Sequence, residues 1–159
     1  MTARVGMGFD VHQFSDDPAR PLMLGGVVLE GERALAGHSD GDVIVHAVAD
    51  ALLGASCLGD LGEHFPDTDE RWRGADSIDL LLASVALVRE AGWSVTNVDC
   101  SVVLEAPRLK PHRQRMMDRL SAAVGAPVSV KAKRAEGLGA LGRHEGIACW
   151  AVALLDDGR

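Results

Sequence analysis

The chain has 159 residues, about the size of one ordinary domain, and 47% of them are hydrophobic and 25% charged. This composition is close to that of soluble globular proteins, so it excludes a disordered or fibrous chain. Sixteen Lys and Arg against 23 Asp and Glu give a net charge of −7, which disfavours nucleic acid as a partner.

The N-terminal part of the chain predicts two strands. Residues 4–14 alternate small, apolar and polar side chains, and residues 21–29 have β-type composition. The pair Gly25-Gly26 marks a turn or a bulge in the second strand.

A helix and a long loop follow. Apolar residues recur at helical spacing over residues 39–56, with Ser39 or Asp40 available as the N-cap. Residues 59–74 are rich in Gly, Pro, Asp and Thr and show no periodicity, so we expect a surface loop of the kind that often carries function.

The rest of the chain predicts two helices and three strands. Asp76 or Ser77 caps a helix that Gly92 ends, and another helix runs over residues 111–124. The expected strands cover residues 95–104, 128–133 and 147–155. This order predicts an α+β fold, a single-domain sandwich over residues 1–159 in which helices cover one face of a mixed β-sheet.

The chain lacks the features of an exported or membrane protein. No apolar stretch reaches the roughly 20 residues that span a bilayer, and the N-terminus has no signal-peptide pattern. Cys57, Cys100 and Cys149 are odd in number and widely spaced among apolar neighbours, which predicts buried, reduced thiols. We therefore expect a cytoplasmic protein without a membrane partner.

Asp10, His12 and His46 form a candidate metal site. Asp10 and His12 lie two residues apart in the first predicted strand, so their side chains leave the same face about 7 Å apart. Carboxylate and imidazole are zinc ligands, and three protein ligands with an open fourth position are typical of catalytic zinc. Spacing alone leaves a second interpretation, in which His46 is a hydrogen-bonded buried histidine and Asp10 a turn carboxylate.

Further residues near this group have two interpretations each. Gly6 and Gly8 leave space on the same strand face for a ligand or for another segment of the chain. Asp42 and Asp50 flank His46 at helical spacing. They form either a solvated helix face or a set of partners that orient an imidazole.

Residues 131–136 read Lys-Ala-Lys-Arg-Ala-Glu and precede several glycines. Basic side chains and free backbone amides bind phosphate oxygens, and Glu136 can bind Mg²⁺ beside them. The alternative is a solvated run of charges that leads into a glycine loop. The nucleotide-binding patterns GxxxxGK[ST] and GxGxxG and the nucleophile pattern GxSxG are absent.

Several segments taken together carry a resemblance to one family. They are RVGMGFDVH (4–12), HSDGD (38–42) with His46, GD (59–60), FPDTD (65–69), GADS (74–77), AP (106–107) and GRHEGIAC (142–149). With these segments the chain resembles the 2-C-methyl-D-erythritol 2,4-cyclodiphosphate synthase family over nearly its whole length.

The resemblance implies a homotrimer with an active site at each subunit interface. The expected enzyme is a phosphorus-oxygen lyase of the non-mevalonate isoprenoid pathway. It converts the cytidine diphosphate substrate 4-diphosphocytidyl-2-C-methyl-D-erythritol 2-phosphate to 2-C-methyl-D-erythritol 2,4-cyclodiphosphate and CMP. The 2-phosphate of the substrate attacks the β-phosphorus with the help of metal ions.

The resemblance also assigns residues to roles. One Zn²⁺ per subunit is implied at Asp10, His12 and His46, and Mg²⁺ or Mn²⁺ at Glu136. The residues implied in substrate binding are His38, Ser39, Asp60, Phe65, Asp67, Lys133, Arg134 and Arg143. Those implied beside the cytidine are Leu104, Ala106, Pro107, Arg108, Leu109 and Lys110. Catalytic roles fall to His38 and Arg134.

The sequence departs from the family pattern at two places. Lys133 and Arg134 stand where many members carry consecutive threonines, so phosphate binding here is expected to depend more on charge. Ala140 stands where many members place a large aromatic near the trimer axis, although Arg143 and Glu145 remain for an isoprenoid diphosphate on that axis.

Two other functions compete with the synthase. In a metal-dependent phosphohydrolase the zinc would activate water, and no cyclic product would form. In a trimeric scaffold a zinc with four protein ligands would only brace the strand against the helix.

Overall fold

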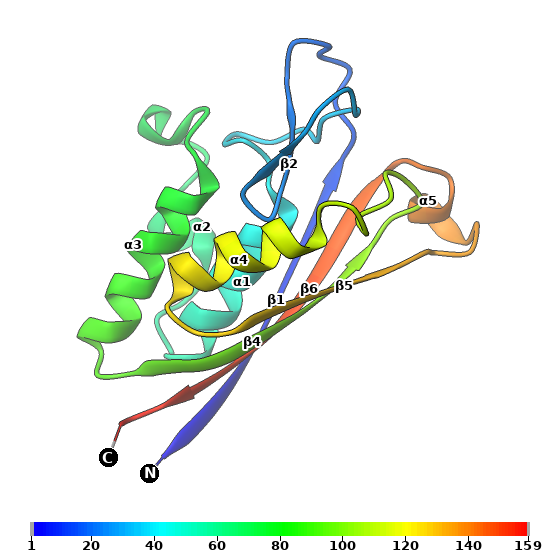
Figure 1. The fold of residues 1–159 in the computed structure, drawn as a ribbon. Coiled ribbons are helices and arrows are strands. Elements are labelled where there is room, and N and C mark those ends of the chain that lie inside the picture. Colours follow the sequence, from blue (N-terminus) through cyan, green and yellow to red (C-terminus); the bar gives the residue numbers. More distant parts are fainter. Residues whose placement is uncertain (1, 159) are drawn as a thin grey trace.

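A four-stranded mixed sheet carries the three long helices on one of its faces in the computed structural model, which describes residues 2–158 (Figure 1). The strands, in their order across the sheet, are β1 (Ala3–Gln13), β6 (Gly146–Asp156), β4 (Ser94–Val103) and β5 (Val128–Lys133). The long helices are α1 (Val43–Ala55), α3 (Ser77–Glu90) and α4 (Arg113–Val124).

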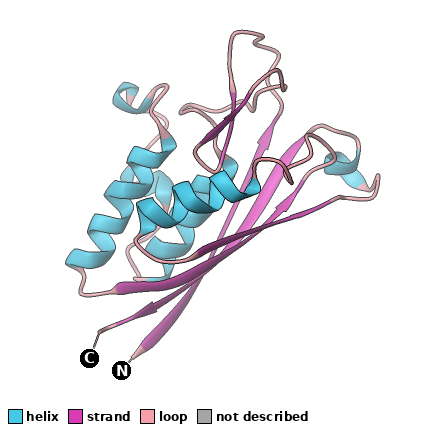
Figure 2. Cartoon of the chain, viewed as in Figure 1, coloured by secondary structure: helices cyan, strands magenta, loops and turns pink. Residues whose placement is uncertain are grey.

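The strand pairing makes the sheet mixed. β6 pairs antiparallel with both β1 and β4, whereas β4 and β5 are parallel. Parallel neighbours need a crossover connection, and α4 provides it between β4 and β5. The predicted α+β sandwich with helices on one face of a mixed sheet is therefore confirmed (Figure 2).

Helix α1 lies between the sheet and α3, so it is buried nearly all round. The helix α3 ends before Gly92, whose φ is 85°, and α4 ends at the left-handed Gly125, as the sequence predicts. No helix within residues 2–158 is long and apolar enough to cross a membrane.

The strand predicted over residues 21–29 is instead a hairpin apart from the main sheet. It consists of β2 (Leu22–Leu24) and β3 (Val27–Leu29), which pair only with each other among the described strands. Gly25 and Gly26 form the turn with φ of 59° and 71°, a conformation that glycine adopts without a steric penalty.

Three short helical turns escape prediction because they are too short to show a period. α2 (Leu61–His64) and a 3-10 turn η1 (Glu70–Trp72) lie in the expected loop, and α5 (Gly139–Gly142) follows β5. The expectation of three buried thiols is wrong for one residue: Cys57 is exposed just after α1, while Cys100 and Cys149 are buried in the sheet.

The face of the sheet that no helix covers is apolar along β1 and β6. Its exposed apolar side chains are Val5, Met7, Phe9, Val11, Trp150 and Val152. Phe9 and Trp150 are cross-strand partners whose ring centroids lie 4.9 Å apart. Such a contiguous apolar surface is unusual in a monomer and indicates an interface.

Candidate metal centre

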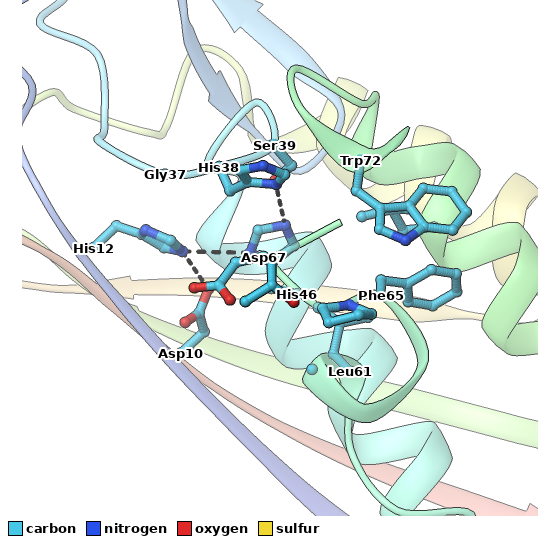
Figure 3. A pocket seen from close by; sticks show the side chains of 14 residues that line it. Asp10, His12, Gly37, His38, Ser39, His46, Leu61, Phe65, Asp67 and Trp72 are labelled. Carbon is cyan, nitrogen blue, oxygen red and sulfur yellow. Dashed lines mark hydrogen bonds and ion pairs between the residues drawn. The ribbon is translucent and has the colours of Figure 1, made fainter. Parts of the chain in front are cut away.

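Asp10, His12 and His46 meet at one end of β1 (Figure 3). Asp10 Oδ2 lies 2.9 Å from His12 Nε2 and 3.0 Å from His46 Nδ1, and the two ring nitrogens are 3.4 Å apart. A tetrahedral zinc with bonds of about 2.0–2.2 Å separates its ligand atoms by roughly 3.3 Å. The three side chains therefore fit a zinc ion, and they form the one such group found within residues 2–158.

The close packing of α1 on β1 brings His46 to the strand. A Cβ atom at Gly6 would lie 2.1 Å from the Ala51 carbonyl oxygen, and one at Gly8 would lie 2.0 Å from that of Ala47. Only glycine permits this approach. The space that the sequence leaves beside Asp10 is thus filled by another chain segment, the helix that carries the third ligand.

Electrostatics keep the Asp10 side chain ionised. Burial alone would raise the pKa of Asp10, but hydrogen bonds from His12 and His46 outweigh burial and hold that pKa well below its usual range. Burial would likewise lower the pKa of His12, yet the hydrogen bond to Asp10 and the negative charge of Asp10 raise it. The ionised Asp10 carboxylate therefore attracts positive charge, and either a proton or a divalent cation can supply that charge.

Asp42 is a structural residue that joins three segments. Its buried carboxylate accepts hydrogen bonds from the N–H groups of Gly25 (2.9 Å) and Gly26 (2.6 Å) in the hairpin turn. It also accepts from Ile44 and Val45, both at 3.1 Å, so Asp42, not Ser39 or Asp40, is the N-cap of α1. Burial raises the pKa of Asp42, and the bond from the Gly26 N–H opposes that shift.

Both interpretations are wrong for Asp42, whose carboxylate is buried and accepts hydrogen bonds from backbone N–H groups. Asp50 is half-buried. Asp50 accepts a hydrogen bond from the Leu61 N–H at 3.3 Å and so fixes the start of α2, and burial raises its pKa. The His46 ring instead meets hydroxyl groups: Nε2 lies 2.8 Å from Ser77 Oγ and 3.1 Å from Ser39 Oγ.

A cavity of about 620 Å³ opens beside the three ligands. Four residues expected at the substrate, His38, Ser39, Phe65 and Asp67, line this cavity. Asp60 is not among the lining residues; its carboxylate caps α2 through the Glu63 N–H at 2.9 Å. His38 Nε2 is buried and has no hydrogen-bond partner within the described part of the chain.

Trp72 belongs to the cavity wall although sequence reasoning missed it. Its ring meets Phe65 edge to face with centroids 5.1 Å apart (Figure 3). The signal available in the sequence is a large aromatic residue in a stretch of Gly, Asp and Pro, where no strand or helix explains it. The two rings form an apolar wall opposite the metal ligands.

The residues expected beside the cytidine lie outside this cavity. Leu104 and Leu109 are buried in the core, whereas the side chains of Arg108 and Lys110 are exposed. Ala106 and Pro107, joined by a cis peptide bond, line a small separate cavity of about 150 Å³.

The basic segment after β5 also lies outside the 620 Å³ cavity. Lys133 and Glu136 are exposed. Arg134 donates two hydrogen bonds to Glu105 Oε2, at 2.9 and 2.7 Å, and holds the pKa of Glu105 below its usual range. Because the Glu105 side chain is only 2% exposed, this ion pair anchors the Arg134 side chain.

Arg143 is not among the residues that line the 620 Å³ cavity. It lines a second cavity of about 600 Å³, whose wall also contains His12. Its Nε donates to Glu145 Oε1 at 2.6 Å, and Ala140 lines the same cavity. His12 therefore lies in the wall of both cavities, the one with Arg143 and the one with His38 and Phe65.

Comparison with known proteins places the chain among close relatives. A sequence model of the YgbB family matches residues 3–156. A protein of Syntrophobacter fumaroxidans named 2-C-methyl-D-erythritol 2,4-cyclodiphosphate synthase is 52% identical over 160 residues, which cover 98% of this chain and 99% of that protein. A protein of Bordetella petrii with the same name is 54% identical over 155 residues, covering 96% and 94%.

Solved structures share the fold. A Plasmodium falciparum protein in complex with CDP matches with a TM-score of 0.83 and 31% identity, covering 96% of this chain and 95% of its own. The bifunctional protein of Campylobacter jejuni gives a TM-score of 0.92 at 40% identity over 97% of this chain. This chain corresponds to 42% of that longer protein.

Proposed function

The chain belongs to the YgbB family, and we propose that it converts 4-diphosphocytidyl-2-C-methyl-D-erythritol 2-phosphate to 2-C-methyl-D-erythritol 2,4-cyclodiphosphate and CMP. This is a step of the non-mevalonate isoprenoid pathway. The observation that carries the proposal is the group of Asp10, His12 and His46 in the wall of a 620 Å³ cavity. The CDP complex of the Plasmodium falciparum relative supports a cytidine nucleotide as part of the substrate.

The reaction needs no nucleophile from the protein. An oxygen of the substrate's 2-phosphate forms a bond to the β-phosphorus, and the bond from that phosphorus to the oxygen of the α-phosphate breaks. The electron pair leaves with CMP, and no water enters, so we classify the enzyme as a cyclising phosphorus-oxygen lyase. The protein must therefore align attacking and leaving oxygens and exclude water, which suits the apolar wall of Phe65 and Trp72.

We assign zinc to Asp10, His12 and His46. When bound, the ion supplies positive charge and an open coordination position for a phosphate oxygen. Three protein ligand atoms within residues 2–158, and not four, support an open position and count against a purely bracing metal. His38, whose free Nε2 lies at the same cavity, is placed to donate a hydrogen bond to a phosphate oxygen.

A second cation, Mg²⁺ or Mn²⁺, is assigned to Glu136. The exposed position of Glu136, outside the group of three ligands, suits an ion held by one carboxylate and completed by substrate phosphates. Lys133 and Arg134 add positive charge to the same segment. We propose that the nucleotide contacts residues 104–110, next to the Arg134 anchor at Glu105.

We propose that three copies of the chain assemble through the apolar sheet face. Val5 and Met7 are 68% and 62% exposed there, and burying such a surface stabilises association. Sedimentation should give the mass of three chains for the wild type and a smaller species for Met7→Glu. Val28→Glu, on the separate hairpin, is the matched control and should leave the assembly intact.

Product analysis tests the proposed reaction. Phosphorus NMR of the purified protein with its substrate should show the cyclic diphosphate and CMP in equal amounts. Chelation of divalent metals should stop the reaction, and adding Zn²⁺ with Mg²⁺ should restore it. An open-chain product or inorganic phosphate would establish the phosphohydrolase instead. The free cysteines of the chain are compatible with the reducing environment of the cytoplasm, where we place the enzyme.

A further inference from the structure

The hydrogen bonds behind each imidazole fix which nitrogen faces the metal position. His12 Nδ1 lies 2.6 Å from the Ala36 carbonyl oxygen, which can only accept. Nδ1 therefore carries the hydrogen. When a metal takes the place of the proton that Nε2 donates to Asp10, the lone pair of Nε2 faces the metal position beside Asp10 and His46, as a metal ligand requires.

The His46 ring has the opposite orientation, and its Nε2 faces two hydroxyl groups, of which Ser39 Oγ at 3.1 Å is the more distant. Its Nε2 lies 2.8 Å from Ser77 Oγ, and the Ser77 hydroxyl is hydrogen-bonded to Asp40 Oδ1. The Asp40 carboxylate accepts two more hydrogen bonds, from the Ser77 N–H at 2.9 Å and the Asp42 N–H at 3.1 Å. Since a carboxylate only accepts, the serine hydrogen points to Asp40, and Ser77 Oγ accepts from His46.

The orientation of the His46 ring follows from this chain of donors. Nε2 carries the hydrogen, so when a metal replaces the proton between Nδ1 and Asp10, Nδ1 has its lone pair free for that metal. Ser77 is fully buried and His46 is 9% exposed, so water does not compete for these bonds. Ser77 is also the first residue of α3, which makes it a rigid support.

We propose that Ser77 and Asp40 are positioning residues that hold His46 in the Nε2–H tautomer and thereby set the affinity of the site for zinc. This inference rests on the metal role proposed above. Partners of this kind raise the affinity of a metal site by roughly 10- to 100-fold. Neither residue lines the 620 Å³ cavity, so both act on the metal position through His46.

Zinc dissociation constants, measured by competition with a chromophoric chelator, test the proposal. Ser77→Ala should weaken zinc binding by roughly 10- to 100-fold, and Ser77→Thr, which keeps the hydroxyl, should retain most of the affinity. Ser84→Ala is the matched control. Ser84 is a buried serine of the same helix whose hydroxyl bonds the Leu80 carbonyl at 2.9 Å, and its loss should leave zinc affinity unchanged.

Asp40→Asn tests the hydrogen bonds from His46 through Ser77 to Asp40 without removing the serine. All three groups that face this side chain are donors, so an amide NH₂ must meet one of them, and zinc affinity should fall. In the zinc-loaded wild type, the proton on His46 Nε2 should exchange slowly in ¹H–¹⁵N NMR spectra. That protection should persist in Ser84→Ala and be lost in Ser77→Ala.

Three results would overturn the proposal. They are a zinc affinity of Ser77→Ala within about 3-fold of the wild type, an equal loss in Ser84→Ala, and a His46 that binds zinc through Nε2. If Ser77→Ala does not fold, Asp40→Asn and the wild-type spectrum decide. A wild type that forms the cyclic product but binds no zinc would refute the metal assignment and this inference, while the reaction assignment would stand.

Discussion

The proposed metal-binding pocket and the segment of residues 131–136 are built in different ways. Asp10, His12 and His46 are mostly buried and are held by contacts from β1, α1 and α3 of one chain. The segment 131–136 is largely exposed, and two of its basic side chains form ion pairs, Arg134 with Glu105 and Lys131 with Asp99.

This contrast indicates which of the proposed site residues a single chain brings together without a partner. The pocket is preformed because helix packing and buried hydrogen bonds position each ligand. The segment 131–136 does not line that pocket, so the substrate contact proposed for it requires a neighbouring copy or a movement. The proposed trimer provides the neighbour.

Loss of a pocket ligand should have the largest effect. His46→Ala should remove zinc and lower turnover by about 10³-fold or more, since a bound cation contributes several kcal/mol to such reactions. Metal analysis and product assays on the purified variant measure both. His64→Ala is the matched control. The His64 ring is hydrogen-bonded to the Leu58 carbonyl and is not one of the three ligands, so this variant should keep one zinc per chain. Full zinc occupancy in His46→Ala would refute the assignment.

A substitution that displaces helix α1 should weaken zinc binding, because α1 carries the ligand His46. Gly8→Ala places a Cβ atom 2.0 Å from the Ala47 carbonyl, so α1 must shift away from β1. We expect about 1–3 kcal/mol lower stability in urea denaturation and weaker zinc binding. Gly54→Ala is the control. Gly54 lies in α1, and a Cβ atom there would have nothing within 4 Å, so this variant should instead stabilise the protein by about 0.5–1 kcal/mol. Unchanged zinc affinity in Gly8→Ala would contradict this account.

Mixed assemblies test whether the two regions meet across an interface. Asp10→Ala and Glu136→Ala should each be inactive alone. Randomly mixed trimers should recover about a quarter of wild-type activity, because each mixed trimer then contains one interface with both intact residues. Activity assays after verified subunit exchange measure this recovery. No recovery would show that one chain supplies both residues to the same site.

The smallest effect concerns charge at the segment 131–136. Lys133→Thr with Arg134→Thr should flatten the rise of KM with salt by a few-fold, because salt screens exposed charges over about 8 Å. Glu105→Gln is a sharper companion, since it releases Arg134 without removing its charge. Equal salt slopes in the parent and the double variant would show that neither cation faces the substrate.

The structure differs from the sequence-based predictions at polar residues that fit two roles and at segments too short to show a period. Asp42 caps α1 and ties it to the hairpin, although its spacing from His46 equally suits a ligand partner. Ser77 contacts His46 from another helix, which helical spacing along α1 cannot indicate. Trp72 joins the cavity through a turn too short to have a period.

Local sequence patterns are enough to predict the alternation of β1, the main helices, and Asp10, His12 and His46 as a candidate metal site, because strand and helix periods are local properties of the chain. Which face of β1 turns inward depends on the packing of the whole fold. Along this strand the glycines and metal ligands face α1, and Val5, Met7 and Phe9 face outward. Local periodicity cannot fix that choice, because it depends on α1 packing against glycines and on the apolar face being left for another surface to cover.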